Sequence, residues 1–195
     1  MNSHVGETII SLNRLDTTKI SYSENSGIKP RKTDGLFDMK IDAIQDFYPD
    51  DIAICYGCGK NNDHGLHIRT IWDGKEGIFR FKPEHYHTAF PGVVYGGLIA
   101  SLIDCHSIGT AIAASYQAED RAPGTEPEIM YVTGKLTVSF VKPTPTEKEL
   151  VLRAHVKELA EKKAIVSCSL YVEDEICAQG EVVVVRVNSR RTGFT

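Results

Sequence analysis

The sequence has no dense stripe of basic residues, because its 22 lysines and arginines are outnumbered by 26 aspartates and glutamates, which leaves a net charge of −4. A nucleic-acid-binding surface needs clustered positive charge against the phosphates, so we expect no nucleic-acid partner. The first residues lack the basic segment and apolar run of a secretory signal. Internal repeats and low-complexity tracts are also missing, which excludes solenoid and repeat architectures.

Long apolar runs are scarce as well. The longest extends from Leu98 to Ala114, and Asp104 and His106 interrupt it. It falls short of the roughly 18 uninterrupted apolar residues of a membrane-spanning helix. The five cysteines are an odd number scattered along the chain, which favours reduced thiols over a disulfide framework. We therefore expect a cytoplasmic protein with no membrane partner.

Composition divides the chain into four parts. Residues 1–35 are polar with few large apolar groups, as in a loosely docked N-terminal arm. Residues 36–50 carry apolar side chains at helical spacing, which predicts a short amphipathic helix that ends at Pro49. Residues 51–188 hold the elements of one globular domain, and 189–195 form a C-terminal tail.

The middle of the chain predicts a hairpin and then one long helix. Alternating segments at 66–72 and 77–81 flank an Asp73-Gly74-Lys75 turn, which is a hairpin signal. The helix is predicted over 94–116, after a turn that contains a glycine pair. Because it is apolar on nearly every side, we place it in the interior of the domain.

The last third predicts a sheet. Alternating apolar residues indicate four long strands, at 131–141, 150–159, 164–172 and 176–187. Consecutive strands with short turns favour an antiparallel meander. A sheet of five or six strands beside a wholly apolar helix must curl around it, which predicts an α+β fold. We expect the remaining sheet edge and face to pair with a second copy.

Asp104 is a single acid in the middle of this apolar helix. A buried carboxylate is costly unless something solvates it or uses it. At the start of the helix, Gly96 and Gly97 offer free backbone N–H groups with the helix dipole behind them, and glycine lets a substrate carbonyl approach closely. Hydrolysis at an acyl carbon needs such a donor and also a base for water. The alternative is that Asp104 is a structural acid, hydrogen-bonded to a neighbouring strand.

The spacing of these groups has a geometric consequence. Asp104 lies about 12 Å beyond Gly96 along the helix axis, at 1.5 Å per residue. One helix therefore cannot easily present both groups to a single carbonyl. In a side-by-side homodimer, Gly96 of one copy meets Asp104 of the other, so we predict a site shared between two chains.

Three segments carry a family resemblance. The phrase Gly92–Asp104 resembles that of the hotdog-fold acyl-CoA thioesterases of the PaaI-like type, which is roughly Gly-x-x-His-Gly-Gly, then a helix with an Asp nine residues after the His. The segment Cys55–Asn61 looks like the lead-in of the mitochondrial-thioesterase-like branch. The strand Tyr131–Pro143 is similar to the family strand after the helix. The resemblance covers about residues 50–187.

The resemblance implies a hotdog fold, in which a curved antiparallel sheet wraps around a central helix, and a hydrolase that needs no metal or other cofactor. Asp104 matches the family's catalytic acid, which acts as general base or nucleophile. Gly96 matches the residue whose N–H polarises the thioester carbonyl, and Thr133 matches a hydroxyl residue that helps to place water. Thr133 is equally explained as an ordinary strand residue. Tyr95 and Ala89 depart from the family's usual His and Asn.

Further residues are expected to bind substrate, namely Tyr95, Gly97, His87 and Lys142. His87 lies in the loop before the helix, where we expect the acyl or pantetheine entrance. Lys142, like Arg121 and Lys135, is a candidate for the phosphates of coenzyme A or else a solvated surface charge. We expect His106 to be a packed or hydrogen-bonded histidine.

One motif has the composition of a zinc site. Cys55, Cys58, His64 and His67 follow the pattern C-x₂-C-x₅-H-x₂-H. Two thiolates and two imidazoles form a tetrahedral zinc set by type. The two pairs stand much closer than in ordinary zinc fingers, however, and the glycines explain the stretch as a turn. We therefore predict no metal here.

The predicted function is an acyl-CoA thioesterase that hydrolyses acyl-CoA to a free acid and CoA, as a homodimer or a tetramer of two dimers. The alternative is a non-catalytic hotdog domain that binds an acyl thioester or a partner protein, which Tyr95 and Ala89 suggest. A dehydratase is disfavoured, because that chemistry pairs a His with an acid and Tyr95 occupies the expected His position.

Overall fold

The structure is a computed structural model and describes residues 42–187. The predicted arm at 1–35, the first part of the predicted 36–50 helix and the predicted tail at 189–195 lie outside the described residues. The described part of 36–50 holds one 3-10 turn, η1 (Ile44–Phe47). The carboxylate of Asp46 accepts a 2.9 Å hydrogen bond from the Ala43 N–H and so fixes the start of this turn.

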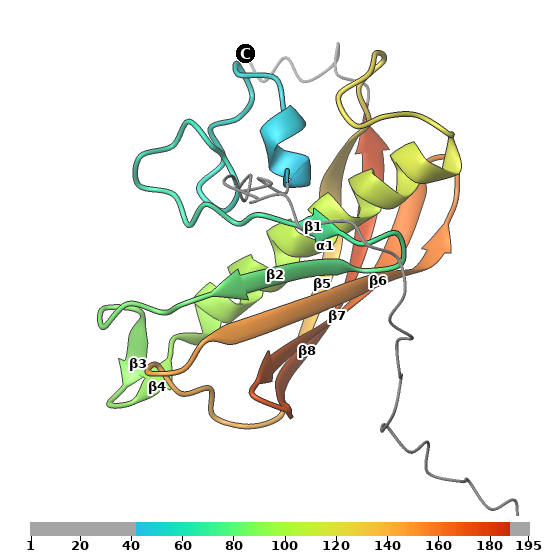
Figure 1. The fold of residues 1–195 in the computed structure, drawn as a ribbon. Coiled ribbons are helices and arrows are strands. Elements are labelled where there is room, and N and C mark those ends of the chain that lie inside the picture. Colours follow the sequence, from blue (N-terminus) through green and yellow to red (C-terminus); the bar gives the residue numbers. More distant parts are fainter. Residues whose placement is uncertain (1–41, 188–195) are drawn as a thin grey trace, which may run out of the picture. The chain divides into compact units, whose positions relative to one another are not determined.

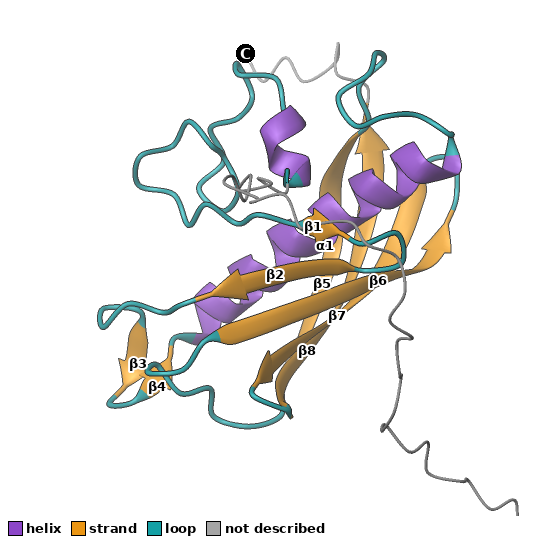
Figure 2. Ribbon diagram, viewed as in Figure 1, coloured by secondary structure: helices purple, strands orange, loops and turns teal. Residues whose placement is uncertain are grey.

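A six-stranded antiparallel sheet packs against one long helix, α1 (Gly96–Ala118), which lies along one face of the sheet (Figure 1). The strand order is β1-β2-β6-β7-β8-β5. The strands are β1 (Ile71–Trp72), β2 (Gly77–Phe81), β5 (Met130–Phe140), β6 (Leu150–Leu159), β7 (Lys163–Val172) and β8 (Glu175–Val187). Figure 2 shows α1 against the sheet, and the predicted α+β class is confirmed.

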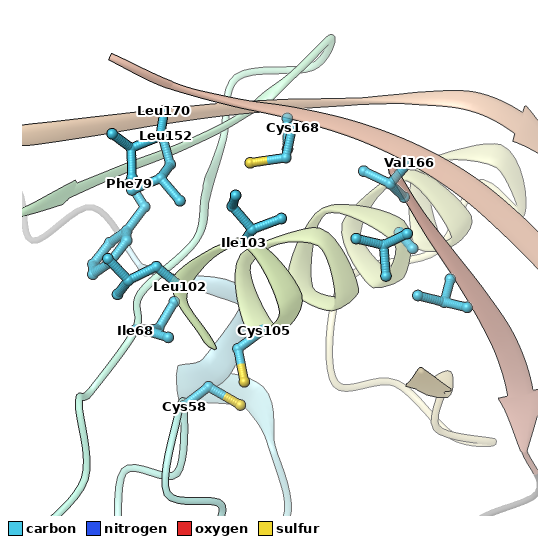
Figure 3. Packing of buried hydrophobic residues seen from close by; sticks show 14 of the residues in the cluster. Cys58, Ile68, Phe79, Leu102, Ile103, Cys105, Leu152, Val166, Cys168 and Leu170 are labelled. Atoms are coloured by element: carbon cyan, nitrogen blue, oxygen red, sulfur yellow. The ribbon is translucent and has the colours of Figure 1, made fainter. Parts of the chain in front are cut away.

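Burial of α1 explains why so apolar a helix exists. It is long and apolar enough to span a membrane by length and composition, but most of it is buried inside the domain. Leu102 and Ile103 are fully buried and belong to the same core cluster as Leu152 and Leu170 of β6 and β7 (Figure 3). Each such side chain contributes about 1.5–3 kcal/mol through burial. The helix is therefore the centre of the core, as predicted.

The predicted four-strand meander is wrong in one connection. Strands β6, β7 and β8 do follow one another, through tight turns at 160–162 and 173–174. Strand β5, however, pairs with β8 at the far edge, and β6 pairs with β2. The link 141–149 is long enough to carry the chain past the end of the sheet, so it does not force its two strands together.

The hairpin before the helix is present but shorter than predicted. Its first strand, β1, begins at Ile71, because the preceding residues bond to a loop instead of to β2. The N–H groups of Leu66 and Ile68 donate to the carbonyls of Tyr56 and Gly57, at 2.8 and 2.9 Å. The loop before the helix also contains a small ladder, β3 (Thr88–Phe90) with β4 (Val93–Val94), which sequence patterns did not indicate.

A buried polar network ties α1 to the strands. His106 is fully buried, and its Nε2 lies 3.1 Å from the Gly77 carbonyl while its Nδ1 lies 3.0 Å from the Thr70 hydroxyl. A carbonyl only accepts, so Nε2 carries the proton and Nδ1 accepts from Thr70. Gln45 completes the network through two bonds to Thr70. The expectation of a hydrogen-bonded His106 is confirmed.

This histidine predicts a loss of stability in mild acid. Burial lowers the pKa of His106 to about 4, so the folded chain keeps it neutral while the unfolded chain takes up a proton below about pH 6.5. Unfolding free energy should therefore fall by about 2 kcal/mol between about pH 7.5 and about pH 5 because of this residue. Urea unfolding of His106→Gln should show a shallower pH dependence than wild type. The exposed control His155→Gln should keep the wild-type slope, and equal slopes for all three proteins would refute the assignment.

Candidate active site

Asp104 and Thr133 meet between the helix and the edge strand. The Thr133 hydroxyl on β5 donates a short hydrogen bond to the Asp104 carboxylate on α1, and both residues are half-buried. The ladder between β5 and β8 shifts register here: Thr133 pairs with Val184 and Lys135 with Val183, which leaves Gly134 as an extra residue. Such a bulge redirects the side chains next to it.

The environment of Asp104 favours its neutral form. Burial raises the pKa of this carboxyl above its ordinary value, and the nearby Cys55 acts in the same direction. The hydrogen bond from Thr133 opposes these effects by stabilising the carboxylate. An acid with a raised pKa is a stronger base once ionised, which is the property that proton abstraction from water requires.

A pocket of about 380 Å³ opens beside this pair. Asp104 and Thr133 lie in a wall that is otherwise mostly apolar. Its apolar side chains include Phe47, Ile52, Ile108, Ile112, Tyr116, Ile129 and Val132. A concave apolar pocket of this size with a few polar groups is typical of a small-molecule site.

The helix N-terminus has the properties of an oxyanion-binding end. The N–H groups of Gly96 and Gly97, at the start of α1, have no intrahelical partner. The N-cap residue, Tyr95, is extended and makes no side-chain hydrogen bond to them. A Cβ on Gly96 would lie 3.3 Å from the ring of Phe140, and a Cβ on Gly97 would lie 2.4 Å from the ring of Tyr95. Glycine therefore keeps this end of the helix uncrowded.

Within one chain, the two halves of the predicted site stay apart. The pocket wall that contains Asp104 and Thr133 does not include Gly96, Gly97 or Tyr95. The structure thus brings Asp104 and Thr133 together, whereas Gly96 and Gly97 lie at the N-terminus of α1, before Asp104 in the same helix.

His87 and Lys142 already have partners. The His87 Nδ1 accepts a 3.0 Å hydrogen bond from the Glu84 N–H, and its carbonyl accepts one of 3.0 Å from the Tyr95 N–H. Partial burial lowers the pKa of His87. Lys142 forms an exposed 2.7 Å ion pair with Glu175. In this arrangement His87 positions the turn before α1, and a phosphate at Lys142 would have to compete with a carboxylate.

The zinc-like motif assembles differently from its sequence pattern. Cys55 and Cys58 group with Cys105 of α1, and their sulfur atoms all lie within 4.8 Å of one another. His64 and His67 are not members of this group. Sequence reasoning missed Cys105, because it lies 47 residues beyond Cys58 and only the fold of the 52–68 loop onto α1 brings it near.

Comparisons with known proteins agree with this architecture. The family model described as "Thioesterase superfamily" matches residues 91–179, a range that contains the helix N-terminus, Asp104 and Thr133. A search of curated proteins finds no match. A crystal structure of a thioesterase superfamily protein from Shewanella loihica is 37% identical, with a TM-score of 0.52, and the match covers 65% of this chain and 96% of that one.

More distant structures share the fold alone. A thioesterase from Haemophilus influenzae is 14% identical with a TM-score of 0.55, and the match covers 67% of this chain and 85% of that one. A protein from Streptococcus mutans, solved bound to acetyl-CoA, is 13% identical with a TM-score of 0.51, over 62% of this chain and 89% of that one. The match to the Shewanella loihica protein is 37% identical and covers 96% of that protein, and the matching family model describes the same superfamily. This chain therefore belongs to the hotdog-fold thioesterase superfamily.

Proposed function

We propose that this protein is an acyl-CoA thioesterase of the PaaI-like type, which hydrolyses acyl-CoA to a carboxylic acid and CoA in a homodimer. The observation that carries the proposal is the hydrogen-bonded Asp104–Thr133 pair in the wall of a mostly apolar pocket. A hydrolase needs its base close to where an apolar acyl group is held, and this pocket offers both.

The chemistry assigns one role to each group. Asp104 accepts one hydrogen bond from a water molecule and then takes that proton. The hydroxyl of Thr133 donates its proton to Asp104, and its oxygen accepts the other hydrogen bond of the water, which orients the water for attack. The water oxygen attacks the thioester carbon, and the Gly96 N–H of the other copy donates to the carbonyl oxygen as negative charge develops there. Collapse of the intermediate breaks the carbon–sulfur bond, and the proton held by Asp104 passes to the departing thiolate. This step releases the acid and the CoA thiol and restores the Asp104 carboxylate.

The exposed edge strand supports the dimer. Strand β5 is the last strand of the sheet, so among residues 42–187 one side of its backbone has no paired strand. Its large apolar residues Val132, Leu136 and Phe140 are 44%, 36% and 58% exposed. Pairing with a second copy would satisfy the edge and cover these side chains. Because Thr133 lies on this strand, such a pairing would bring the other copy close to the pocket.

Substrate class follows from the pocket lining. The apolar walls favour an apolar acyl group of medium length or an aromatic one, and the acetyl-CoA bound to the Streptococcus mutans protein supports a CoA thioester as the substrate. The alternative is a non-catalytic domain of the same fold, which the exposed Tyr95 in place of the family His favours.

A thiol-release assay tests the proposal. We expect the protein to release free CoA from apolar medium-chain or aromatic acyl-CoAs at least about tenfold more efficiently than from acetyl-CoA, because each buried methylene adds binding in the pocket. Steady-state kcat/KM over short, medium, long and aromatic acyl-CoAs is the measurement. Saturable binding of the same esters by calorimetry without thiol release would establish the non-catalytic alternative. Hydration of an enoyl-CoA without thiol release would establish a dehydratase.

A further inference from the structure

Three cysteines from two distant segments converge beside the candidate active site. Cys55 and Cys58 lie in the loop that follows η1, and Cys105 lies on α1 directly after Asp104. All three sulfurs lie within 4.8 Å of one another, and those of Cys55 and Cys105 are 3.9 Å apart. Figure 3 shows the sulfurs of Cys58 and Cys105 close together on one side of α1.

The loop is built to bring these sulfurs together. In the sequence Cys55-Tyr56-Gly57-Cys58-Gly59, the Gly59 N–H donates a 2.8 Å hydrogen bond to the Cys55 carbonyl and closes a tight turn. A Cβ on Gly57 would lie only 2.3 Å from the Cys105 sulfur. Glycine at 57 is therefore what lets the helix cysteine join the other two.

The spacing fits a tetrahedral thiolate site. Zinc–sulfur bonds of about 2.3 Å in a tetrahedron place neighbouring sulfurs about 3.8 Å apart. The 3.9 Å between Cys55 and Cys105 is close to that edge length, and the upper limit of 4.8 Å for the cluster requires only small side-chain adjustments.

A second observation is independent of the sulfurs. The hydroxyl of Tyr48 is buried and has no hydrogen-bond partner within the described residues 42–187. It lines the same pocket as the three cysteines. An unpaired buried hydroxyl costs about 1–3 kcal/mol, and a polar ligand at the cluster would relieve that cost.

We propose that Cys55, Cys58 and Cys105 bind one zinc ion, whose fourth position is occupied by a pocket water that Tyr48 hydrogen-bonds. The ion would fasten the 55–58 loop to α1 next to Asp104 and so shape one wall of the pocket. Three thiolates suit zinc among the divalent ions, because soft sulfur ligands in a tetrahedral arrangement select it. This inference does not depend on the proposed thioesterase activity.

Metal content of the full-length protein is the primary test. Protein loaded with Zn²⁺ and freed of excess by gel filtration should hold about one zinc per chain by mass spectrometry of the metal. Cys58→Ser and Cys105→Ser should hold less than about a tenth of that amount. Cys168→Ser is the matched control, because Cys168 is buried on the strand side of α1 (Figure 3), and it should retain the wild-type amount.

Two further variants sharpen the test. Gly57→Ala keeps all three thiols but its methyl group displaces the Cys105 sulfur, so it should lower zinc retention even though no ligand is missing. The double variant His64→Ala and His67→Ala should retain zinc fully. Loss of zinc in that double variant would instead establish the C-x₂-C-x₅-H-x₂-H set and overturn the three-cysteine site.

A readout on the wild-type chain avoids dependence on the folding of any variant. Bound zinc should protect the exposed Cys55 from alkylation, and removal of the metal by a chelator should expose it. A Zn²⁺-loaded chain that holds less than about a tenth of an equivalent of metal would overturn the proposal. So would a disulfide among Cys55, Cys58 and Cys105, detected by mass spectrometry without reduction, since that would identify a redox pair in place of a metal site.

Discussion

Asp104→Asn should lower kcat for acyl-CoA hydrolysis by about 10²- to 10⁴-fold, the usual contribution of a general base. The amide has nearly the same shape as the carboxylate, and its oxygen can still accept the hydrogen bond from Thr133. It cannot accept a proton from water. Binding of the substrate should change little, so the loss should appear in kcat and in kcat/KM alike.

Stability distinguishes catalysis from a structural role for this acid. Because burial disfavours the ionised form of Asp104, a neutral amide should leave the free energy of unfolding unchanged or raise it slightly. A structural acid would instead lose stability on the same change. Asp120→Asn, an exposed substitution just beyond the end of α1, is the matched control and should affect neither quantity. Turnover of Asp104→Asn within about threefold of wild type would refute the catalytic assignment.

Two inactive variants should restore activity when they are combined in one dimer. Gly96→Pro removes the proposed oxyanion donor while the helix is kept, since proline is well tolerated at the first helical position and Tyr95 already has the extended conformation that precedes proline. Each homodimer, of Gly96→Pro or of Asp104→Asn, should be nearly inactive. The heterodimer should recover about half of wild-type turnover, because one of its two sites combines an intact Gly96 with an intact Asp104.

The reciprocal heterodimer is the control. A chain that carries both substitutions, paired with a wild-type chain, has one defect in each shared site and should be inactive. If each site instead lay within a single chain, the outcomes would reverse: the first heterodimer would be inactive and the second would keep about half of the activity. Purification through two different affinity tags, followed by thiol-release kinetics, separates these results.

Local sequence was sufficient for most of the elements. The long helix could be predicted because apolar residues occupy nearly all of its faces after a glycine pair, and the strands could be predicted because apolar residues alternate along them. The order of β6, β7 and β8 followed from their short turns. The position of β5 could not be predicted, because the 141–149 link is compatible with more than one neighbour for that strand.

One part of the candidate site could also be predicted from the sequence, and another part depended on the tertiary structure. Helical rise alone separates Gly96 from Asp104, so the expectation of a site shared between two chains needed no structure. The contact between Asp104 and Thr133, which are 29 residues apart, depends on packing of α1 against the sheet edge and on the bulge at Gly134. Resemblance to a family suggested this pair, but neither residue indicates the other through local pattern.

The cysteines mark the limit of sequence reasoning most clearly. Spacing along the chain grouped Cys55 and Cys58 with two nearby histidines, because a motif is recognised only among neighbours. In the folded chain the loop at 52–68 lies against α1, and Gly57 leaves space for the sulfur of Cys105. Periodicity and spacing are local properties, and they determined the helix, the strands and the distance between the two half-sites. Tertiary packing decided which side chains meet across those elements. Residues that are far apart in the sequence come into contact only when whole helices, strands and loops pack against one another.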